Sequence, residues 1–263
     1  MSRAGALGIA VLLLVTLAIS AAAEIVVSPL TIEVAAEPGE TQTGSFVVRN
    51  AGTEIENVSV SAFGYTLDAS GGLLLDPVVR SLLPFLTFFP ASVAVAPGEE
   101  KTVQFQFAAP LESGDHWAVF FVEGSTVTPV GTTVGEVQTS VGVKVRYGVK
   151  LIQRDPNAVK DGAVVSMTLA STKAPSVNVR FANLGTSVLR KATGSVEFRD
   201  VSGAVVAQAA LGEFTTLPGG WRDLVVAIPD EVLRAHSDYL ALCVIDFGGD
   251  HLVAGELQFS VEQ

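Results

Sequence analysis

Hydrophobic and polar residues alternate with a period of two along almost the whole chain after its N-terminal segment. In residues 101–108, for example, valine and phenylalanine occupy every second position, and threonine and glutamine stand between them. Such runs, rich in Val, Thr and Phe and bounded by Gly, Pro, Asn and Asp, are typical of β-strands with one buried face. They recur at intervals of roughly 8–12 residues, the spacing of a β-sandwich. The pattern therefore predicts an all-β protein.

The most polar stretch in the middle of the chain is residues 153–161, which predicts a linker between two domains. Strand-like runs fill both sides of it, so we expect two tandem immunoglobulin-like β-sandwiches, over residues 24–152 and 162–263. Residues 72–86 are apolar but broken by proline, and a short helical turn is an alternative to strand within 77–83.

Residues 1–23 have the layout of a secretory signal peptide. Arg3 precedes an apolar run, and three alanines at 21–23 fit a cleavage site of small residues. Because the run approaches the ~20 residues of a membrane-spanning helix, an uncleaved anchor is the alternative. The alanine-rich end and Glu24 favour cleavage. We therefore expect an exported protein, periplasmic or extracellular at the cell surface, that meets a membrane only through the signal peptide before cleavage.

Composition excludes several classes of protein. The chain has 16 Lys and Arg against 27 Asp and Glu, a net charge of −11, so it lacks the cations that nucleic-acid binding requires. With 49% hydrophobic and 16% charged residues it is not a disordered chain. Its single cysteine, Cys243, has no partner for an internal disulfide and lies in an apolar run, so we expect it to be buried.

No catalytic motif of a hydrolase, nucleotide-binding enzyme or metalloprotease occurs in the sequence, so we expect no enzyme activity and no cofactor. Asp115 and His116 follow a turn and are expected to be a surface pair. Trp117 opens a dense apolar run and is expected in the core. Trp221 follows a Pro-Gly-Gly turn and is expected to be half exposed, where a sugar-stacking role is the alternative.

A hard-cation or zinc site is a further alternative, because acidic and histidine side chains gather near a Gly-Gly hairpin turn towards the C-terminus. These residues are His236, Asp238, Asp246, Asp250 and His251. Metal ligands must converge in space, whereas turns favour aspartate for local reasons. We therefore expect no metal here.

The end of the first half is its most distinctive segment. Residues 134–152 predict a long final strand or a pair of strands, with apolar residues at the odd positions from 141 to 151. Lys144, Arg146 and Lys150 fall on the opposite face. An ordinary half-buried strand explains this pattern. An exposed edge that pairs with a partner chain explains it too, and cations on such an edge also block unwanted pairing.

Several features occur in an order that resembles the N-terminal domain of periplasmic pilus-assembly (fimbrial) chaperones. They are Pro29, Pro38-Gly39-Glu40, Asn50-Ala51-Gly52, Phe89-Pro90, residues 93–99 and the cation-bearing final strand. The second, smaller sandwich fits the two-domain plan of that family.

The resemblance implies that the final strand donates alternating hydrophobic residues to an incomplete subunit. It also implies that a cation on this strand, with an arginine on the first strand, holds the C-terminal carboxylate of the subunit. The donated residues would be Val141, Val143, Val145 and Tyr147, and the anchoring cation Lys144 or Arg146. The first strand, residues 24–34, contains no Arg or Lys, so that half of the anchor is missing.

Three functions therefore compete. The first is an exported, non-enzymatic chaperone-like protein that binds a secreted or pilus-type subunit by β-strand addition. The second is a structural or adhesive cell-surface module with its binding surface elsewhere. The third is an enzyme or metal-dependent carbohydrate binder, which requires the C-terminal acidic groups or Trp221 to converge in one pocket.

Overall fold

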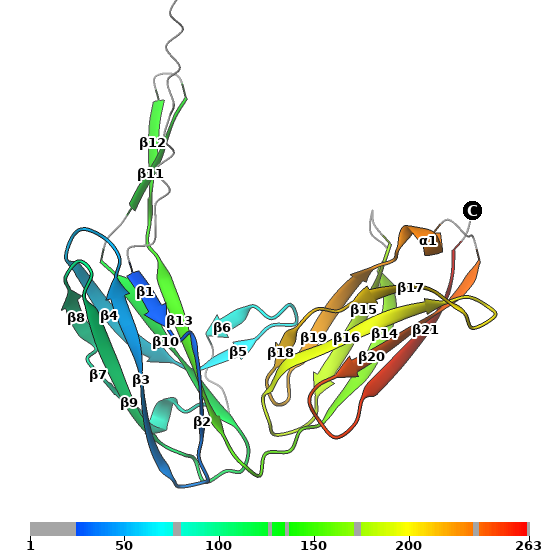
Figure 1. Cartoon of the computed structure of the whole chain (residues 1–263), viewed down its shortest axis with the longest axis horizontal. Helices are drawn as coiled ribbons and strands as arrows, with labels where there is room; N and C mark the ends of the chain where they lie inside the picture. Colours follow the sequence, from blue (N-terminus) through cyan, green and yellow to red (C-terminus); the bar gives the residue numbers. More distant parts are fainter. Residues whose placement is uncertain are drawn as a thin grey trace, which may run out of the picture.

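The structure is a computed structural model that describes residues 25–75, 80–125, 128–134, 137–170, 175–233 and 237–261. The expected signal peptide, residues 1–23, lies outside the described residues, and so does its cleavage site. In the described part of the chain, no helix has the length and apolarity needed to cross a membrane. Regular structure is almost entirely β, as the alternation predicts, and it forms two β-sandwiches side by side (Figure 1).

The first sandwich packs two sheets face to face. One sheet has the order β1 (Ile25–Ser28), β3 (Thr41–Asn50), β9 (Glu100–Ala108) and β7 (Leu86–Phe89). The other has the order β2 (Thr31–Ala35), β13 (Arg146–Arg154), β10 (His116–Gly124), β4 (Glu56–Phe63) and β8 (Ser92–Val95). Neighbouring strands are antiparallel except β2 and β13, which run parallel. Since β1 and β2 belong to different sheets, the start of the described chain changes sheet within a few residues.

Alternating residues of these strands fill the first core. Phe120 of β10 lies at its centre, with its ring centroid 5.3 Å from that of Phe46, 5.4 Å from Phe88 and 5.7 Å from Phe105. Strand β10 is buried on both faces, because Trp117 and its neighbours on the outer face belong to a separate buried cluster. This explains why its sequence is continuously apolar rather than alternating.

The second sandwich is built in the same way. Its smaller sheet contains β14 (Gly162–Ala170), β15 (Ser176–Asn183) and β19 (Trp221–Ala227). Its larger sheet contains β17 (Val205–Ala210), β16 (Leu189–Arg199), β20 (Asp238–Asp246) and β21 (Val253–Ser260), with β18 (Phe214–Thr216) also paired to β16. A single helical turn, α1 (Asp230–Leu233), precedes β20.

Two hairpins stand apart from the sandwich sheets. Strands β5 (Tyr65–Leu67) and β6 (Leu73–Leu75) form one, and β11 (Thr128–Val134) and β12 (Val137–Val143) form the other. The proline-broken stretch 72–86 thus contains a strand, and a 3-10 turn at Leu83–Phe85 follows the position expected for a helical turn. Residues 76–79 of that stretch lie outside the described residues.

The connection between the sandwiches is tied down by backbone hydrogen bonds. The amides of Thr186 and Ser187 both donate to the carbonyl of Val159, and the amides of Leu184 and Gly185 donate to that of Asp161. Strand β13 extends through residues 153 and 154, the first two of the expected linker. The domain boundaries at 152 and 162 stay a prediction.

Cys243 is fully buried in the second core, as its apolar surroundings predict. Burial raises the pKa of its thiol to about 11. Because the thiolate is the reactive form, only about one thiol in a thousand is ionised at pH 8 even before access is considered. We expect the native protein to resist maleimide at that pH and the protein unfolded in guanidinium to react at once, as measured by intact mass. Rapid labelling of the native protein would contradict this burial.

Candidate functional site

Strand β13 has one partly open edge. Strand β2 pairs with it only from Lys150, opposite Thr31, to Arg154, opposite Ala35. Residues 146–149 pair with β10 on one side, and no described strand pairs with them on the other. Unpaired backbone groups of this kind are a template for an added strand.

The β11–β12 hairpin precedes this open edge and extends away from the first sandwich (Figure 1). Its register places Val141 opposite Val130 and Val143 opposite Thr128. No other described strand pairs with either strand of the hairpin. Two of the expected partner-binding residues, Val141 and Val143, therefore lie on a projecting element that leads into the edge of β13.

The chain between residues 134 and 152 forms two strands rather than one, because β12 ends at Val143 and β13 starts at Arg146. Val145, in the break, is 44% exposed. Tyr147 is half-buried and packs against the first core, and the apolar positions that follow it are fully buried. The alternation read from the sequence thus describes β13 well, but it does not continue as one flat strand through 144–145.

Lys144 and Arg146 both form ion pairs with one carboxylate on β10. The Nζ atom of Lys144 lies 3.2 Å from Oε2 of Glu123, and Nε of Arg146 lies 2.5 Å from Oε1. The hydrogen bond from Lys144, followed by that from Arg146, holds the pKa of Glu123 below its usual range in spite of partial desolvation. The Arg146 guanidinium also lies 4.9 Å from the ring centre of Phe121. Both cations therefore have internal partners.

Lys150 is the cation of this strand that sequence reasoning did not select. It is half-buried, and its neighbours across the strands are Val119 on β10 and Thr31 on β2. Within the part of the chain that the structure describes, its ammonium group forms no ion pair or side-chain hydrogen bond. In the sequence, Lys150 falls on the same face as Lys144 and Arg146. In the structure it differs from them because no described residue serves as its counterion.

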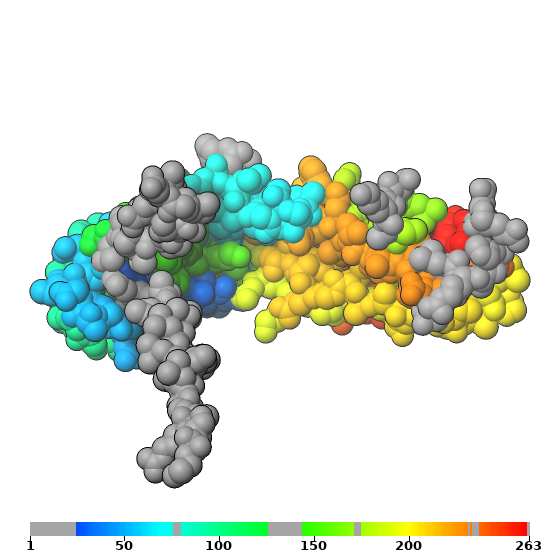
Figure 2. Space-filling view, turned by 90° about the horizontal axis from the view of Figure 1, so that it is seen from above, coloured from blue at the N-terminus to red at the C-terminus, as the bar shows by residue number. Residues whose placement is uncertain are grey.

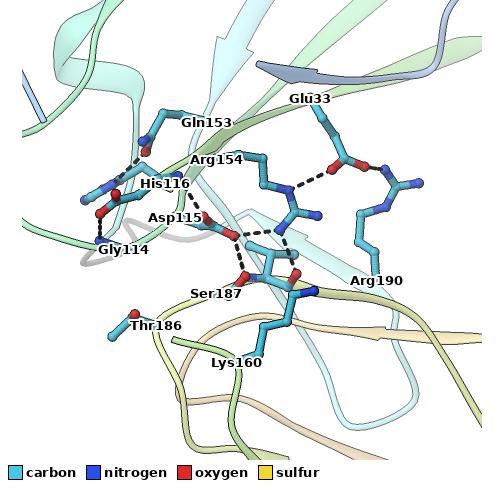
Figure 3. A network of polar contacts seen from close by, with 12 residues as sticks. Glu33, Gly114, Asp115, His116, Gln153, Arg154, Lys160, Thr186, Ser187 and Arg190 are labelled. Carbon is cyan, nitrogen blue, oxygen red and sulfur yellow. Dashed lines mark hydrogen bonds and ion pairs between the residues drawn. The ribbon is translucent and has the colours of Figure 1, made fainter. Parts of the chain in front are cut away.

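A buried carboxylate joins the two sandwiches where β13 ends (Figure 3). Oδ2 of Asp115 accepts hydrogen bonds from Arg154 at 2.6 Å, from the hydroxyl of Ser187 at 3.0 Å and from the amide of Val188 at 2.7 Å. Its Oδ1 accepts one from the amide of Asp155 at 3.0 Å. The side chain of Asp115 is 1% exposed. Four donors from both sandwiches thus satisfy one buried charge.

The expectation of a surface pair at residues 115 and 116 is wrong. His116 is buried as well, with Nδ1 3.1 Å from Oε1 of Gln153, whose amide nitrogen donates to the carbonyl of Ala36. Both residues follow a turn, but the second sandwich covers Asp115 and the end of β13 covers His116. A turn-like sequence does not show whether a distant segment of the chain packs over the turn.

Asp155 supports the same junction. Its Oδ2 accepts a 2.6 Å hydrogen bond from the amide of Gly114 and a 3.0 Å bond from the hydroxyl of Ser113, and its Oδ1 accepts from the amide of Asn157. Burial acts to raise the pKa of Asp155, but these hydrogen bonds outweigh it and hold the pKa below its usual range. The carboxylate is therefore ionised and organises the turn before β10.

Strand β2 presents an acid, not a cation, to this junction. Glu33 pairs with Arg154, at 2.7 Å between Oε2 and Nε, and with Arg190 of the second sandwich. As the sequence shows, residues 24–34 contain no Arg or Lys. In the structure, the Glu33 carboxylate on β2 instead links arginines from both sandwiches.

Among the described residues, the candidate metal ligands do not converge. Asp238 and Asp246 lie at opposite ends of β20, where the first accepts from the hydroxyl of Ser260 and the second from the amide of Gly248. His251 packs its ring edge-on against Phe247, with centroids 5.5 Å apart. No cluster of three or more potential ligands occurs among the described residues, which do not include His236.

The two tryptophans differ as the sequence predicts. Trp117 is 1% exposed and donates its indole N–H to the carbonyl of Tyr65 at 2.8 Å. Trp221 is 49% exposed, with the Arg180 guanidinium 5.8 Å from its ring centre. Trp221 lies beside a pocket of about 540 Å³ between the sandwiches, to which Arg80 also contributes. The pocket holds no group that points to a particular ligand.

Solved structures of fimbrial chaperones and their complexes align with most of this chain. A chain of a chaperone–tip adhesin complex of CFA/I fimbriae aligns with a TM-score of 0.50 and 9% identity, covering 89% of this chain and 98% of that chain. The class 5 fimbriae chaperone CfaA aligns with a TM-score of 0.49 and 11% identity, over 88% and 98% of the two chains. A chain of the CsuC–CsuE pre-assembly complex of Acinetobacter baumannii gives 0.46 and 12%, over 89% and 98%.

No family model matches the sequence, and no curated protein sequence matches it. At 9% identity, the first structural alignment establishes a common fold. It covers both sandwiches and so confirms the expected architecture of two immunoglobulin-like domains. It does not by itself transfer an activity or a partner.

Proposed function

We propose that this protein is an exported, non-enzymatic chaperone-like protein that binds a secreted or pilus-type subunit by β-strand addition. The observation that carries the proposal is the open edge of β13 at residues 146–149, which continues into the projecting β11–β12 hairpin. The shared fold with a chain of a fimbrial chaperone–adhesin complex supports it.

Backbone hydrogen bonds to the open edge would supply affinity, and alternate side chains would supply register and specificity. The residues that we propose for this role are Val141, Val143, Val145 and Tyr147. Lys144 precedes the edge, Arg146 is its first residue, and both pair with Glu123, so a partner that recruits either cation must replace an existing ion pair. The same two cations also discourage the edge from pairing with unrelated strands.

Lys150 is the cation that we propose for a terminal carboxylate of the subunit. It is half-buried on the strand that would receive the partner, and no described residue neutralises it. A hydrogen bond to a charged group contributes roughly 1.5–3 kcal/mol, and more where water is excluded. Lys144 and Arg146 are alternatives that first have to release Glu123.

The test is capture of the partner from the native exported fraction by the tagged protein. The variants are Lys150→Ala and the double variant Lys144→Ala/Arg146→Ala. Lys101→Ala is the charge-matched control, because Lys101 lies on β9, in the other sheet of the first sandwich, and pairs with Glu99 in the turn before that strand. We expect wild type and control to retain a β-rich subunit, and Lys150→Ala to bind it roughly 10- to 100-fold more weakly.

Each outcome is informative. Equal capture by Lys150→Ala and Lys101→Ala would remove Lys150 from the site, and a selective loss in the double variant would assign the anchor to Lys144 or Arg146. If wild type captures no subunit, strand addition is wrong, and a structural or adhesive cell-surface module becomes the better description.

A further inference from the structure

The β5–β6 hairpin belongs to neither sandwich sheet and crosses from the first sandwich to the second (Figures 1 and 2). Its base is buried. Tyr65 is 2% exposed, and Leu67 and Leu73 pack on a cluster that also contains Val188 and Leu217 of the second sandwich. The hairpin is therefore anchored in the apolar contact between the two sandwiches.

The tip of the hairpin is a turn that its own side chains organise. Oδ1 of Asp68 accepts hydrogen bonds from the amide of Ser70 at 2.9 Å, from its hydroxyl at 2.7 Å and from the amide of Gly72 at 2.8 Å. The amide of Gly71 donates to the carbonyl of Asp68. These bonds set the shape of the turn without any contribution from the second sandwich.

This turn fits against the start of β19 in the second sandwich. The amide of Asp223 donates to the carbonyl of Ala69 at 2.8 Å. A Cβ atom at Gly71 would lie 1.5 Å from Nη1 of Arg222, and the φ of Gly71 is +89°. The guanidinium of Arg222 thus occupies the space that only glycine leaves free. Its Nε is buried and has no hydrogen-bond partner among the described residues.

The second sandwich is consequently attached at two separate places. Asp115 holds residues 187 and 188, in the connection before β16, and the hairpin tip holds residues 222 and 223 of β19. Two domains joined by a linker usually move relative to each other unless their interface is large and apolar. A single attachment permits such a pivot, whereas two attachments on different elements oppose both bending and twisting.

We propose that the β5–β6 hairpin is a strut that holds the two sandwiches at one angle in the free protein, with the contact between Gly71 and Arg222 as its fitted joint. The angle between the sandwiches, and with it the width of the space between them, is then already fixed in the absence of a partner. The proposal goes beyond the proposed function and does not depend on it, since it concerns the protein alone.

The chain offers a matched pair of substitutions. Residues 200–204 repeat the turn chemistry of 68–72, with Asp200 accepting from the amide and hydroxyl of Ser202 and from the amide of Ala204. The φ of Gly203 is +84°, and no atom lies within 4 Å of a Cβ built there. Gly71→Val and Gly203→Val therefore impose similar backbone strain, but only the first displaces Arg222.

The readout is the distance distribution between spin labels on Thr102→Cys and Gln258→Cys, one exposed position on each sandwich. Cys243 is buried and does not take the label. We expect a narrow distribution in the parent and in Gly203→Val, and a broadened or shifted one in Gly71→Val. Circular dichroism and unfolding curves establish that both variants are folded.

A broad distribution in the parent, or equal distributions in the two valine variants, would overturn the strut. If Gly71→Val does not fold, Arg222→Ala replaces it, because it removes the guanidinium and leaves the turn intact. A distribution unchanged by Arg222→Ala would then reject Arg222 as the joint. No partner is present in these measurements, so their failure is distinct from a failure of subunit capture.

Discussion

Replacement of Asp115 by asparagine is expected to lower the free energy of unfolding by about 3–5 kcal/mol, the usual cost of breaking a buried ion pair. The variant keeps the size of the side chain but leaves Arg154 without its buried counterion, and it weakens the bonds from Ser187 and Val188. At about 2–4 °C per kcal/mol for a chain of this size, Tm should fall by roughly 6–20 °C. Urea and thermal unfolding measure both quantities.

The control is Asp223→Asn, which removes another aspartate–arginine pair. Oδ1 and Oδ2 of Asp223 lie 2.6 and 2.7 Å from Nε and Nη2 of Arg180, but the Arg180 side chain is 45% exposed. Exposed pairs contribute about 0–1 kcal/mol. Equal losses of unfolding free energy in Asp115→Asn and Asp223→Asn would show that the buried ion pair at the junction stabilises the protein no more than the exposed pair.

Phe120→Ala is expected to destabilise the first sandwich by about 3–5 kcal/mol. The ring is fully buried on β10 and contacts three other phenylalanine rings, so its removal loses their packing and leaves a cavity among strands of both sheets. The midpoint of urea unfolding, followed by the fluorescence of nearby Trp117, measures the loss.

Phe89→Ala is the matched substitution on the surface. Phe89 lies on the edge strand β7 and is 76% exposed. We expect its replacement to change stability by no more than about 0.5 kcal/mol. A comparable loss from both variants would place Phe89 in a packed interface and contradict its exposure.

The strand content and the division into two sandwiches could be predicted from local pattern. In β9, Val103, Phe105 and Phe107 are buried and the two glutamines between them are exposed, as their alternation predicts. The burial of Trp117 and Cys243 follows from their apolar neighbours in the same way. Successive side chains of a strand point to opposite faces of the sheet. The face that carries the apolar side chains is therefore the buried one.

The candidate site depended on contacts that no local pattern records. The open edge at residues 146–149 exists because the parallel pairing with β2 begins only at Lys150, some 120 positions along the chain from Thr31. Lys144 and Arg146 look like free cations in the sequence, and their partner Glu123 is on another strand. Lys150 is distinguished from them only by the lack of such a partner among the described residues.

The junction between the sandwiches was likewise decided by tertiary structure. Asp115 and His116 occur in a turn-like sequence, yet both are buried, and the residues that bond Asp115 come from segments 39 to 73 positions away. The sequence by itself determined the all-β class, the two sandwiches and the buried face of the strands that alternate, such as β9, because these follow from the two-residue period of a strand. Only the tertiary structure decided which edge is open and which charges are paired, because both depend on how distant segments pack together.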